Sequence, residues 1–298
     1  MSPEPGTVGV PDSVTELEHR LEGERYFADA GLLTAIRLAL ALGRPLLLEG
    51  EPGVGKTEVG NVLARVLGRE LIRLQCYEGL DPTQALYEWN YPKQLLSMRA
   101  AEARGADIGD IYDERFLLER PLLRAVRSPA GVLLLVDEID RSDSEFEAFL
   151  LELLSDFQVS IPELGTISAT TIPHVVLTSN GTRELSDALR RRCLYHYVDY
   201  PDVEREALII MARIDGATAS LSLQIARMVE GIRKEELRKV PGVAETLDWA
   251  AALVGIGVHD LIETPETVHE TLMCLLKTHE DKSRLTREVT MRILGKVA

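Results

Sequence analysis

Residues 50–57 read Gly-Glu-Pro-Gly-Val-Gly-Lys-Thr, and Pro45-Leu-Leu-Leu-Glu49 comes directly before them. The short apolar run predicts a buried strand, and the stretch from Glu58 to Leu67 is suited to a helix. A strand, a loop of the form G-x-x-x-x-G-K-[ST] and a helix, in that order, are typical of a phosphate-binding P-loop. The sequence therefore predicts that the chain binds a nucleoside triphosphate.

The residue types in this loop suit polyphosphate chemistry. Glycines let the backbone fold tightly enough to aim successive N–H groups at one phosphate. We expect Lys56 to reach the β- and γ-phosphates and the Thr57 hydroxyl to ligate Mg²⁺. ATP and Mg²⁺ are thus the predicted cofactors, and the predicted contacts are Glu51, Pro52, Gly53, Val54, Gly55, Lys56, Thr57 and Glu58.

The composition is that of an ordinary globular protein, with 298 residues, 45 % hydrophobic and 27 % charged. No apolar run approaches the roughly 18 residues of a membrane helix, so we expect no transmembrane segment. The N-terminus lacks the pattern of a signal peptide, and the three scattered cysteines are typical of reduced core residues, so we expect a cytoplasmic location. A formal net charge of −15 argues against nucleic acid as a partner, although a local basic groove stays compatible with it.

The pattern after the loop alternates helices with short buried strands, which predicts a parallel sheet flanked by helices. A helix is expected over about 28–42, and helices follow the Pro201-Asp202 boundary at about 203–214, 220–238, 243–254 and from 266 onward. The predicted strands are 45–49, 70–75, 131–136, 174–178 and 194–198. The predicted organisation is a flexible leader (1–23), an α/β nucleotide-binding domain (24–200) and an all-helical C-terminal lid domain (201–298).

The connection from residue 76 to 130 is well above ordinary connection lengths, so we expect an insertion there. Tyr87, Trp89 and Tyr91 alternate within it, which predicts that they share one face of an extended segment.

Two acids follow the strand 131–136. In a P-loop protein, an acid at the tip of the strand beside the loop holds Mg²⁺, directly or through water, and Asp137 has this position. Glu138 is placed to polarise a water for attack on the γ-phosphate. A solvated acidic turn is the alternative, which the P-loop makes the weaker one. Asn180, after the next strand, is predicted to hydrogen-bond the γ-phosphate or the water, and a strand-ending Asn cap is its alternative.

Arginines 190–192 form a basic cluster in an acidic chain. Three consecutive arginines cannot all point into their own subunit's active site. An arginine that projects to a neighbouring subunit stabilises transition-state charge there. Arg191 and Arg192 are the predicted catalytic arginines, but which of the three acts in trans stays open, as does a solvated basic turn.

Together these residues resemble the AAA+ ATPases and, within them, the MoxR family. The insertion lies where this clade carries its helix-2 insert, and residues 137–154 are similar to the MoxR stretch "DEINR…LLEAM". The remaining motifs that carry the resemblance are Gly50–Thr57 (similar to Walker A), Val132–Glu138 (Walker B), Asn180 (sensor 1) and Leu185–Arg192 (arginine-finger segment).

A narrower likeness, to the CoxD-type branch of that family, lies in residues 26–31, 43–46, 76–81 and 243–249. That branch is associated with maturing the molybdenum–copper carbon monoxide dehydrogenase. The resemblance implies a homo-oligomer, a hexameric ring, with ATP-driven remodelling of a client enzyme complex and a von Willebrand factor A-domain co-chaperone. Many AAA+ lids place a sensor 2 arginine where this chain has Glu245, so no sensor 2 residue is predicted.

The predicted function is an ATPase whose hydrolysis moves the lid and re-aims the insertion. Tyr87, Trp89 or Tyr91 would then touch a client or partner at the ring's central pore, unless these aromatics pack on their own domain. The sequence does not name the client. One alternative, a nucleic-acid motor or clamp loader, is disfavoured by the net charge. The other, a nucleotide-gated scaffold with little turnover, is disfavoured by the intact Lys56 and Asp137-Glu138 set.

Overall fold

The computed structural model describes residues 9–104 and 111–297, which form two compact units. The first unit comprises the chain up to residue 17, residues 30–49 and residues 57–197. The second comprises residues 18–29, 50–56 and 198 to the end. Residues 1–8 of the predicted leader lie outside the described part.

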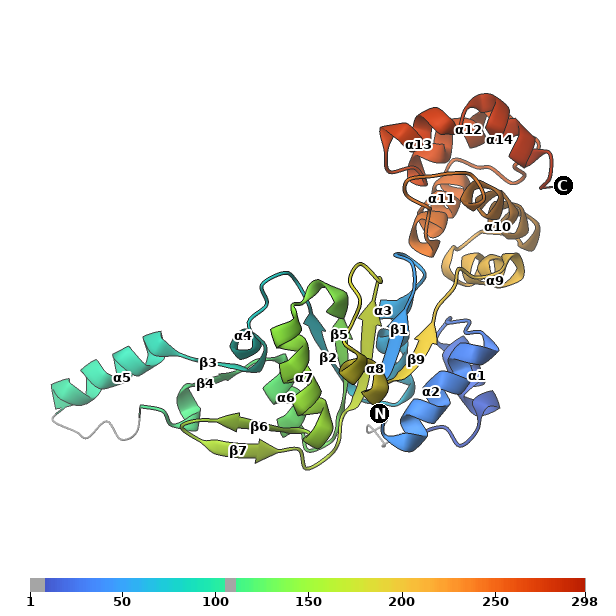
Figure 1. The fold of residues 1–298 in the computed structure, drawn as a ribbon. Helices are drawn as coiled ribbons and strands as arrows, with labels where there is room; N and C mark the ends of the chain where they lie inside the picture. Colours follow the sequence, from blue (N-terminus) through green and yellow to red (C-terminus); the bar gives the residue numbers. More distant parts are fainter. Residues whose placement is uncertain (1–8, 105–110, 298) are drawn as a thin grey trace, which may run out of the picture. The chain divides into compact units, whose positions relative to one another are not determined.

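A five-stranded parallel sheet forms the centre of the first unit (Figure 1). Its strand order is β2-β5-β8-β1-β9. The predicted α/β fold is confirmed, and each strand begins and ends close to its predicted range. The strands are β1 (Leu46–Glu49), β2 (Glu70–Gln75), β5 (Val132–Asp137), β8 (His174–Ser179) and β9 (Leu194–Tyr197).

The strand order could not be read from the sequence. In the sheet, β8 lies between β5, which carries Asp137, and β1, which leads into the P-loop. Short, continuously apolar strands carry no signal for their partners, so the order cannot be read from them. As a result, the carboxyl ends of β5 and β8, with Asp137 and Asn180, are direct neighbours at one edge of the sheet.

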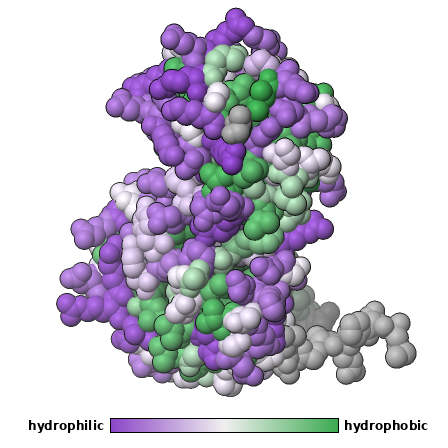
Figure 2. All heavy atoms as spheres, turned by 90° about the vertical axis from the view of Figure 1, so that its right-hand side faces the viewer, coloured by the Kyte–Doolittle hydropathy of each residue, from purple (hydrophilic) through white to green (hydrophobic). Residues whose placement is uncertain are grey.

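Apolar residues are concentrated inside rather than outside. Figure 2 shows hydrophilic residues over much of the face that it presents. Within residues 9–104 and 111–297, no helix has the length and apolar character needed to cross a bilayer.

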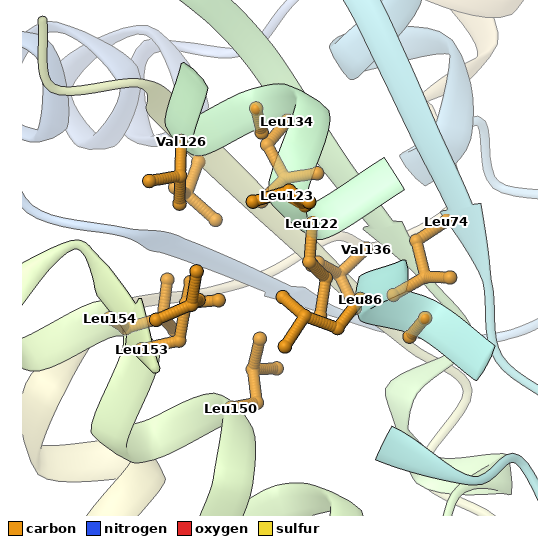
Figure 3. Close-up of a cluster of buried hydrophobic side chains, with 14 of the residues drawn as sticks. Leu74, Leu86, Leu122, Leu123, Val126, Leu134, Val136, Leu150, Leu153 and Leu154 are labelled. Atoms are coloured by element: carbon orange, nitrogen blue, oxygen red, sulfur yellow. The ribbon is translucent and has the colours of Figure 1, made fainter. Parts of the chain in front are cut away.

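Strand β5 is buried along its whole length because helices cover both faces of the sheet. Leu134 and Val136 point to one face, where leucines of α6 and α7 surround them (Figure 3). Leu135 points to the other face and meets α3 at Gly60, where a Cβ would lie 3.0 Å from the leucine side chain. The helices that accompany the sheet are α2 (Ala30–Leu42), α3 (Lys56–Val66), α4 (Pro82–Leu86), α6 (Pro121–Arg127), α7 (Ser144–Asp156) and α8 (Asp187–Arg192), and a hairpin of β6 (Gln158–Ile161) and β7 (Gly165–Ser168) follows α7.

The insertion contains an antiparallel pair, β3 (Tyr87–Trp89) and β4 (Leu117–Glu119), with α5 (Tyr91–Arg104) between them in the chain. A single 3₁₀ turn, η1 (Glu114–Phe116), leads into β4. Residues 105–110 of the predicted insertion lie outside the described residues.

The predicted row of three aromatics on one extended face is wrong. Tyr91 is the first residue of α5 rather than part of the strand, and its side chain is 64 % exposed. Trp89 is 6 % exposed and belongs to the core cluster that contains Phe116. Tyr87 lies against the same core, with its ring centroid 6.1 Å from that of Trp89. Trp89 therefore packs on its own domain, which is the alternative to client contact.

The predicted flexible leader is wrong for its second half. Residues 14–23 form helix α1 (Val14–Gly23), and Leu17 and Leu21 on it are completely buried. Leucines four residues apart lie on one helical face, and the Ser13 hydroxyl accepts the Glu16 N–H at 3.1 Å as an N-terminal cap. Both signals are present in the sequence.

The second unit is helical from residue 203 onward. Its centre contains a buried ion pair between Arg233 and Glu206, 2.7 Å apart, to which the Thr246 hydroxyl adds a hydrogen bond of 2.8 Å. Helix α10 ends at Arg233, five residues before its predicted end at 238. The helices are α9 (Val203–Arg213), α10 (Ala219–Arg233), α11 (Val243–Gly255), α12 (Pro265–Thr271), α13 (His279–Arg284) and α14 (Arg287–Leu294), with a 3₁₀ turn, η3 (Leu272–Cys274), after α12.

Candidate functional site

The loop between β1 and α3 surrounds the Lys56 side chain and hydrogen-bonds its ammonium group. Lys56 is 6 % exposed, and its Nζ donates hydrogen bonds of 2.7 Å to the carbonyls of Gly50 and Glu51. Gly53 and Gly55 have φ angles of 82° and 97°, a region in which any side chain is strained. The two glycines therefore make the loop's path possible, and the path brings a buried ammonium group to its centre.

The other predicted loop residues have different environments. Glu51 and Pro52 are exposed, and Val54 is buried. Glu58 lies in the first turn of α3, where its carboxylate accepts a hydrogen bond of 2.9 Å from Asn61. The Glu58 side chain thus stabilises its own helix.

Thr57 and Asp137, the two predicted metal ligands, are in direct contact although 80 residues separate them in the chain. The Thr57 hydroxyl donates a hydrogen bond of 2.9 Å to Oδ1 of Asp137, which is only 2 % exposed. The Thr178 hydroxyl of β8 donates to the same oxygen. Because the Thr57 hydroxyl acts as the donor in this hydrogen bond, the lone pairs of its oxygen stay available to a cation. These oxygen donors fit Mg²⁺.

Glu138 sits in a left-handed backbone conformation, with φ of 55°. This conformation is uncommon for residues other than glycine, and such strain concentrates at functional sites. The Glu138 N–H donates to the Thr178 hydroxyl at 2.9 Å, and Oε2 lies 3.0 Å from a guanidinium nitrogen of Arg141. The carboxylates of Glu138 and Asp137 therefore have different partners, although the two residues are adjacent in sequence.

Asn180, at the end of β8, is fixed through its backbone by Asp140. The Asn180 N–H donates to Asp140 at 3.2 Å, and Thr182 donates its N–H at 3.0 Å and its hydroxyl at 2.6 Å. Burial acts to raise the pKa of Asp140, but these hydrogen bonds, led by the Thr182 hydroxyl, hold that pKa below its usual value. Asp140 is therefore an ionised anchor for the segment that carries Asn180.

Cysteine chemistry plays no part at this edge of the sheet. Cys76 follows β2 and donates its N–H to the Asp137 carbonyl at 2.8 Å. Burial, together with the nearby Asp137 carboxylate, raises the pKa of the Cys76 thiol to about 12. The thiol is thus protonated at neutral pH and is no nucleophile.

The three arginines of α8 divide into one inward and two outward residues. Arg190 forms an ion pair of 2.9 Å with Glu49 and lies over the Tyr195 ring. Arg191 and Arg192 are exposed, and Arg44 donates to their backbone carbonyls. Arg190 is therefore held within its own subunit.

The start of α8 is fixed by a buried acid of α7. Glu147 is 2 % exposed, forms an ion pair with Arg183 and accepts the Ser186 N–H at 2.9 Å. Sequence reasoning missed Glu147 and Asp140. The spacing of acids along 137–147 was visible, but their partners belong to a loop whose position only the fold determines.

Glu245, at the place of a sensor 2 arginine, caps its own helix in the second unit. Its Oε2 accepts the Gly242 N–H at 3.0 Å. In the same unit, Val243 donates its N–H to the carbonyl of Gly53 in the P-loop, at 2.9 Å. Helix α11 therefore meets the loop through its backbone.

Comparisons with known proteins identify relatives of this chain. The family model of the AAA domain (dynein-related subfamily) matches residues 45–193. The gas vesicle ATPase GvpN of Haloferax mediterranei is 26 % identical, and the match covers 88 % of this chain and 77 % of GvpN. The chaperone MoxR1 of Mycobacterium tuberculosis is 27 % identical over 79 % of this chain and 58 % of MoxR1. The denitrification regulatory protein NirQ of Pseudomonas aeruginosa is 26 % identical over 72 % of this chain and 78 % of NirQ.

Proposed function

Since the chain belongs to the AAA domain family, in its dynein-related subfamily, we propose that it is a MoxR-type ATPase that remodels a client protein complex. The observation that carries the proposal is the hydrogen bond between Thr57 and Asp137. It joins the residue after the P-loop lysine to the acid of the second motif, as an ATP site requires. Relatives named as an ATPase and as a chaperone support the same class.

In the proposed site, Gly53, Val54 and Gly55 offer backbone N–H groups to the phosphates, and Lys56 adds its charge. Glu51, Pro52 and Glu58 flank these donors, and the Glu58 carboxylate acts by stabilising the start of α3. Thr57 would hold Mg²⁺ through its hydroxyl oxygen. Asp137 would hold it through its carboxylate, directly or through a water. When bound, the metal neutralises charge on the phosphates.

Glu138 is the proposed base for the attacking water. Its side chain is 34 % exposed, so a water molecule can reach the carboxylate, whereas Asp137 is buried. Asn180 would orient that water or the γ-phosphate from the end of the neighbouring strand. The strained turn at Glu138 and the Asp140 anchor at Asn180 support this division of roles.

Arg191 and Arg192 would complete the site of a neighbouring subunit. Both are exposed at the end of α8, while Arg190 is bound to Glu49. A homo-oligomeric ring, hexameric by its resemblance to the MoxR family, gives these arginines a partner site. Stabilisation of the transition state by an arginine in trans is worth about 10³–10⁵ in rate in comparable systems.

The relatives support the class of ATPase, but their names do not point to one client. The names of the relatives refer to gas vesicles, to a chaperone and to denitrification, so similar chains serve different processes. The CoxD-type resemblance favours maturation of a molybdenum–copper carbon monoxide dehydrogenase in the cytoplasm, with a von Willebrand factor A-domain protein as co-chaperone.

Replacement of the proposed base tests this function. We expect Glu138→Gln to bind ATP normally and to lower its hydrolysis about 10²–10⁴-fold, because the amide cannot accept the proton of the water. Glu152→Gln is the matched control, since Glu152 is an exposed acid of α7. Release of phosphate measures the rate. Equal rates for Glu138→Gln and the control would rule out the assigned base, and the absence of hydrolysis by the wild type would rule out the ATPase.

A further inference from the structure

Arg73, on the edge strand β2, contacts the carboxylate that is proposed to serve the metal. Its Nε donates to Oδ2 of Asp137 at 3.1 Å, and a second guanidinium nitrogen donates to the same oxygen. The Arg73 side chain is 49 % exposed and Asp137 is 2 % exposed, so the guanidinium covers the carboxylate from the solvent side.

The register of the sheet explains this contact. Arg73 pairs with Leu135, and Gln75 pairs with Asp137. Arginine is long enough to reach diagonally across the strands, two residues further on. The Gln75 side-chain oxygen accepts a hydrogen bond from the guanidinium and orients it toward the acid.

Both oxygens of Asp137 therefore have donors among the described residues. Oδ1 accepts from Thr57 and Thr178, and Oδ2 accepts from Arg73. A divalent cation at Thr57 would thus approach a carboxylate whose charge is already balanced by a guanidinium. The two cations would repel each other.

We infer that Arg73 is a positioning residue that sets the Mg²⁺ requirement of nucleotide binding, because its charge balances the Asp137 carboxylate and repels a metal ion held there. The inference rests on the proposed ATP site. Loss of the Arg73 charge raises the affinity for Mg²⁺, whether the metal binds Asp137 directly or through a water. At a separation of about 6 Å in a water-like dielectric, the repulsion between a divalent and a monovalent cation corresponds to about a tenfold change in affinity.

The test is a Mg²⁺ titration of the full chain in the presence of a fluorescent ATP analogue, with binding rather than turnover as the readout. We expect Arg73→Gln to lower the half-saturating Mg²⁺ concentration about tenfold, because glutamine keeps a hydrogen-bond donor but carries no charge. Arg73→Lys keeps the charge and should stay near the wild-type concentration.

Arg124→Gln is the matched control. Arg124 is another exposed arginine whose ion pair, with Glu70, lies at the opposite end of β2, and its loss should leave the Mg²⁺ requirement unchanged. Thermal unfolding with and without Mg²⁺ and the analogue, on all three variants, gives a second readout that also reports on folding. An unchanged or higher Mg²⁺ requirement in a folded Arg73→Gln variant overturns the inference alone. Failure of the wild type to bind the analogue at any Mg²⁺ concentration overturns the proposed function with it.

Discussion

At the scale of single residues, four carboxylates within residues 137–147 each have their own set of partners. Asp137 binds Thr57 and Arg73, and Glu138 binds Arg141. Asp140 holds the backbone at Asn180, and Glu147 holds the start of α8. The first two acids could be assigned from the sequence because they follow an apolar strand after a P-loop. The other two could not, because hydrogen-bonding to a distant loop leaves no local pattern.

Asp140 offers a test of this arrangement. Asn at this position places an amide NH₂ against groups that are themselves donors, so Asp140→Asn should lower the free energy of unfolding by about 1–3 kcal/mol. Because Asn180 is then less firmly placed, kcat for ATP should fall roughly 10- to 100-fold while KM changes little. Urea unfolding and steady-state kinetics measure both. Asp248→Asn, at an exposed position of α11, is the control. A variant with the stability and kcat of the control would contradict the anchoring role.

Asp140 should also make the stability of the protein depend on pH. The pKa of Asp140 is lower in the folded than in the unfolded protein, so its contribution to stability is complete above the unfolded value of about 3.9. The contribution is lost as the pH falls through the folded pKa. We therefore expect the stability difference between wild type and Asp140→Asn to stay constant from neutral pH to the ordinary aspartate range and to shrink below it. Unfolding curves at several pH values measure this, and a difference that grows on acidification would contradict the assignment.

At the scale of elements, the sequence predicted those whose periodicity is strong. The sheet strands and α2 agree with their predicted ranges, because a continuous apolar run or a helical repeat marks each of them. The insertion was predicted to exist from its length alone, but its internal structure was not. Tyr87, Trp89 and Tyr91 alternate in sequence, yet the strand ends at Trp89 and α5 begins at Tyr91. Alternation over so few residues does not distinguish a strand from a strand followed by a helix.

The two ends of that aromatic run should behave differently when truncated. Trp89→Ala removes a buried indole from the core cluster that contains Phe116 and should lower the free energy of unfolding by about 3–5 kcal/mol. Tyr91→Ala changes an exposed ring and should stay within about 0.5 kcal/mol of wild type. Chemical denaturation measures both. Similar losses of stability in the two variants would contradict the placement of Tyr91 outside the core.

The exposed ring of Tyr91 keeps one earlier hypothesis open. Of the three aromatics, it is the residue available for contact with a client or partner. Binding of a candidate client to Tyr91→Ala, compared with wild type, tests that hypothesis without the loss of stability expected for Trp89→Ala.

At the scale of the whole molecule, the proposed nucleotide site occurs together with two exposed arginines, Arg191 and Arg192. The parallel sheet brings Thr57, Asp137 and Thr178 together, and Asn180 follows Thr178 at the end of β8. Among the residues described, Arg191 and Arg192 form no ion pair, whereas Arg190 forms one with Glu49. If the proposed site is completed by a neighbouring subunit, these two arginines have a role there, and hydrolysis would depend on the assembly.

Mixing of two inactive variants tests whether the arginines of one subunit complete the site of the next. One variant carries Glu138→Gln, and the other carries Arg191→Ala together with Arg192→Ala. Each alone should assemble and bind ATP but hydrolyse it at least 10²-fold more slowly than wild type. In an equimolar mixed ring, about a quarter of the head-to-tail interfaces combine an intact Glu138 with intact arginines. We expect phosphate release to recover to about a quarter of the wild-type rate on mixing. A mixture that stays as inactive as its two components, or a double arginine variant that is fully active alone, would contradict this role of the arginines.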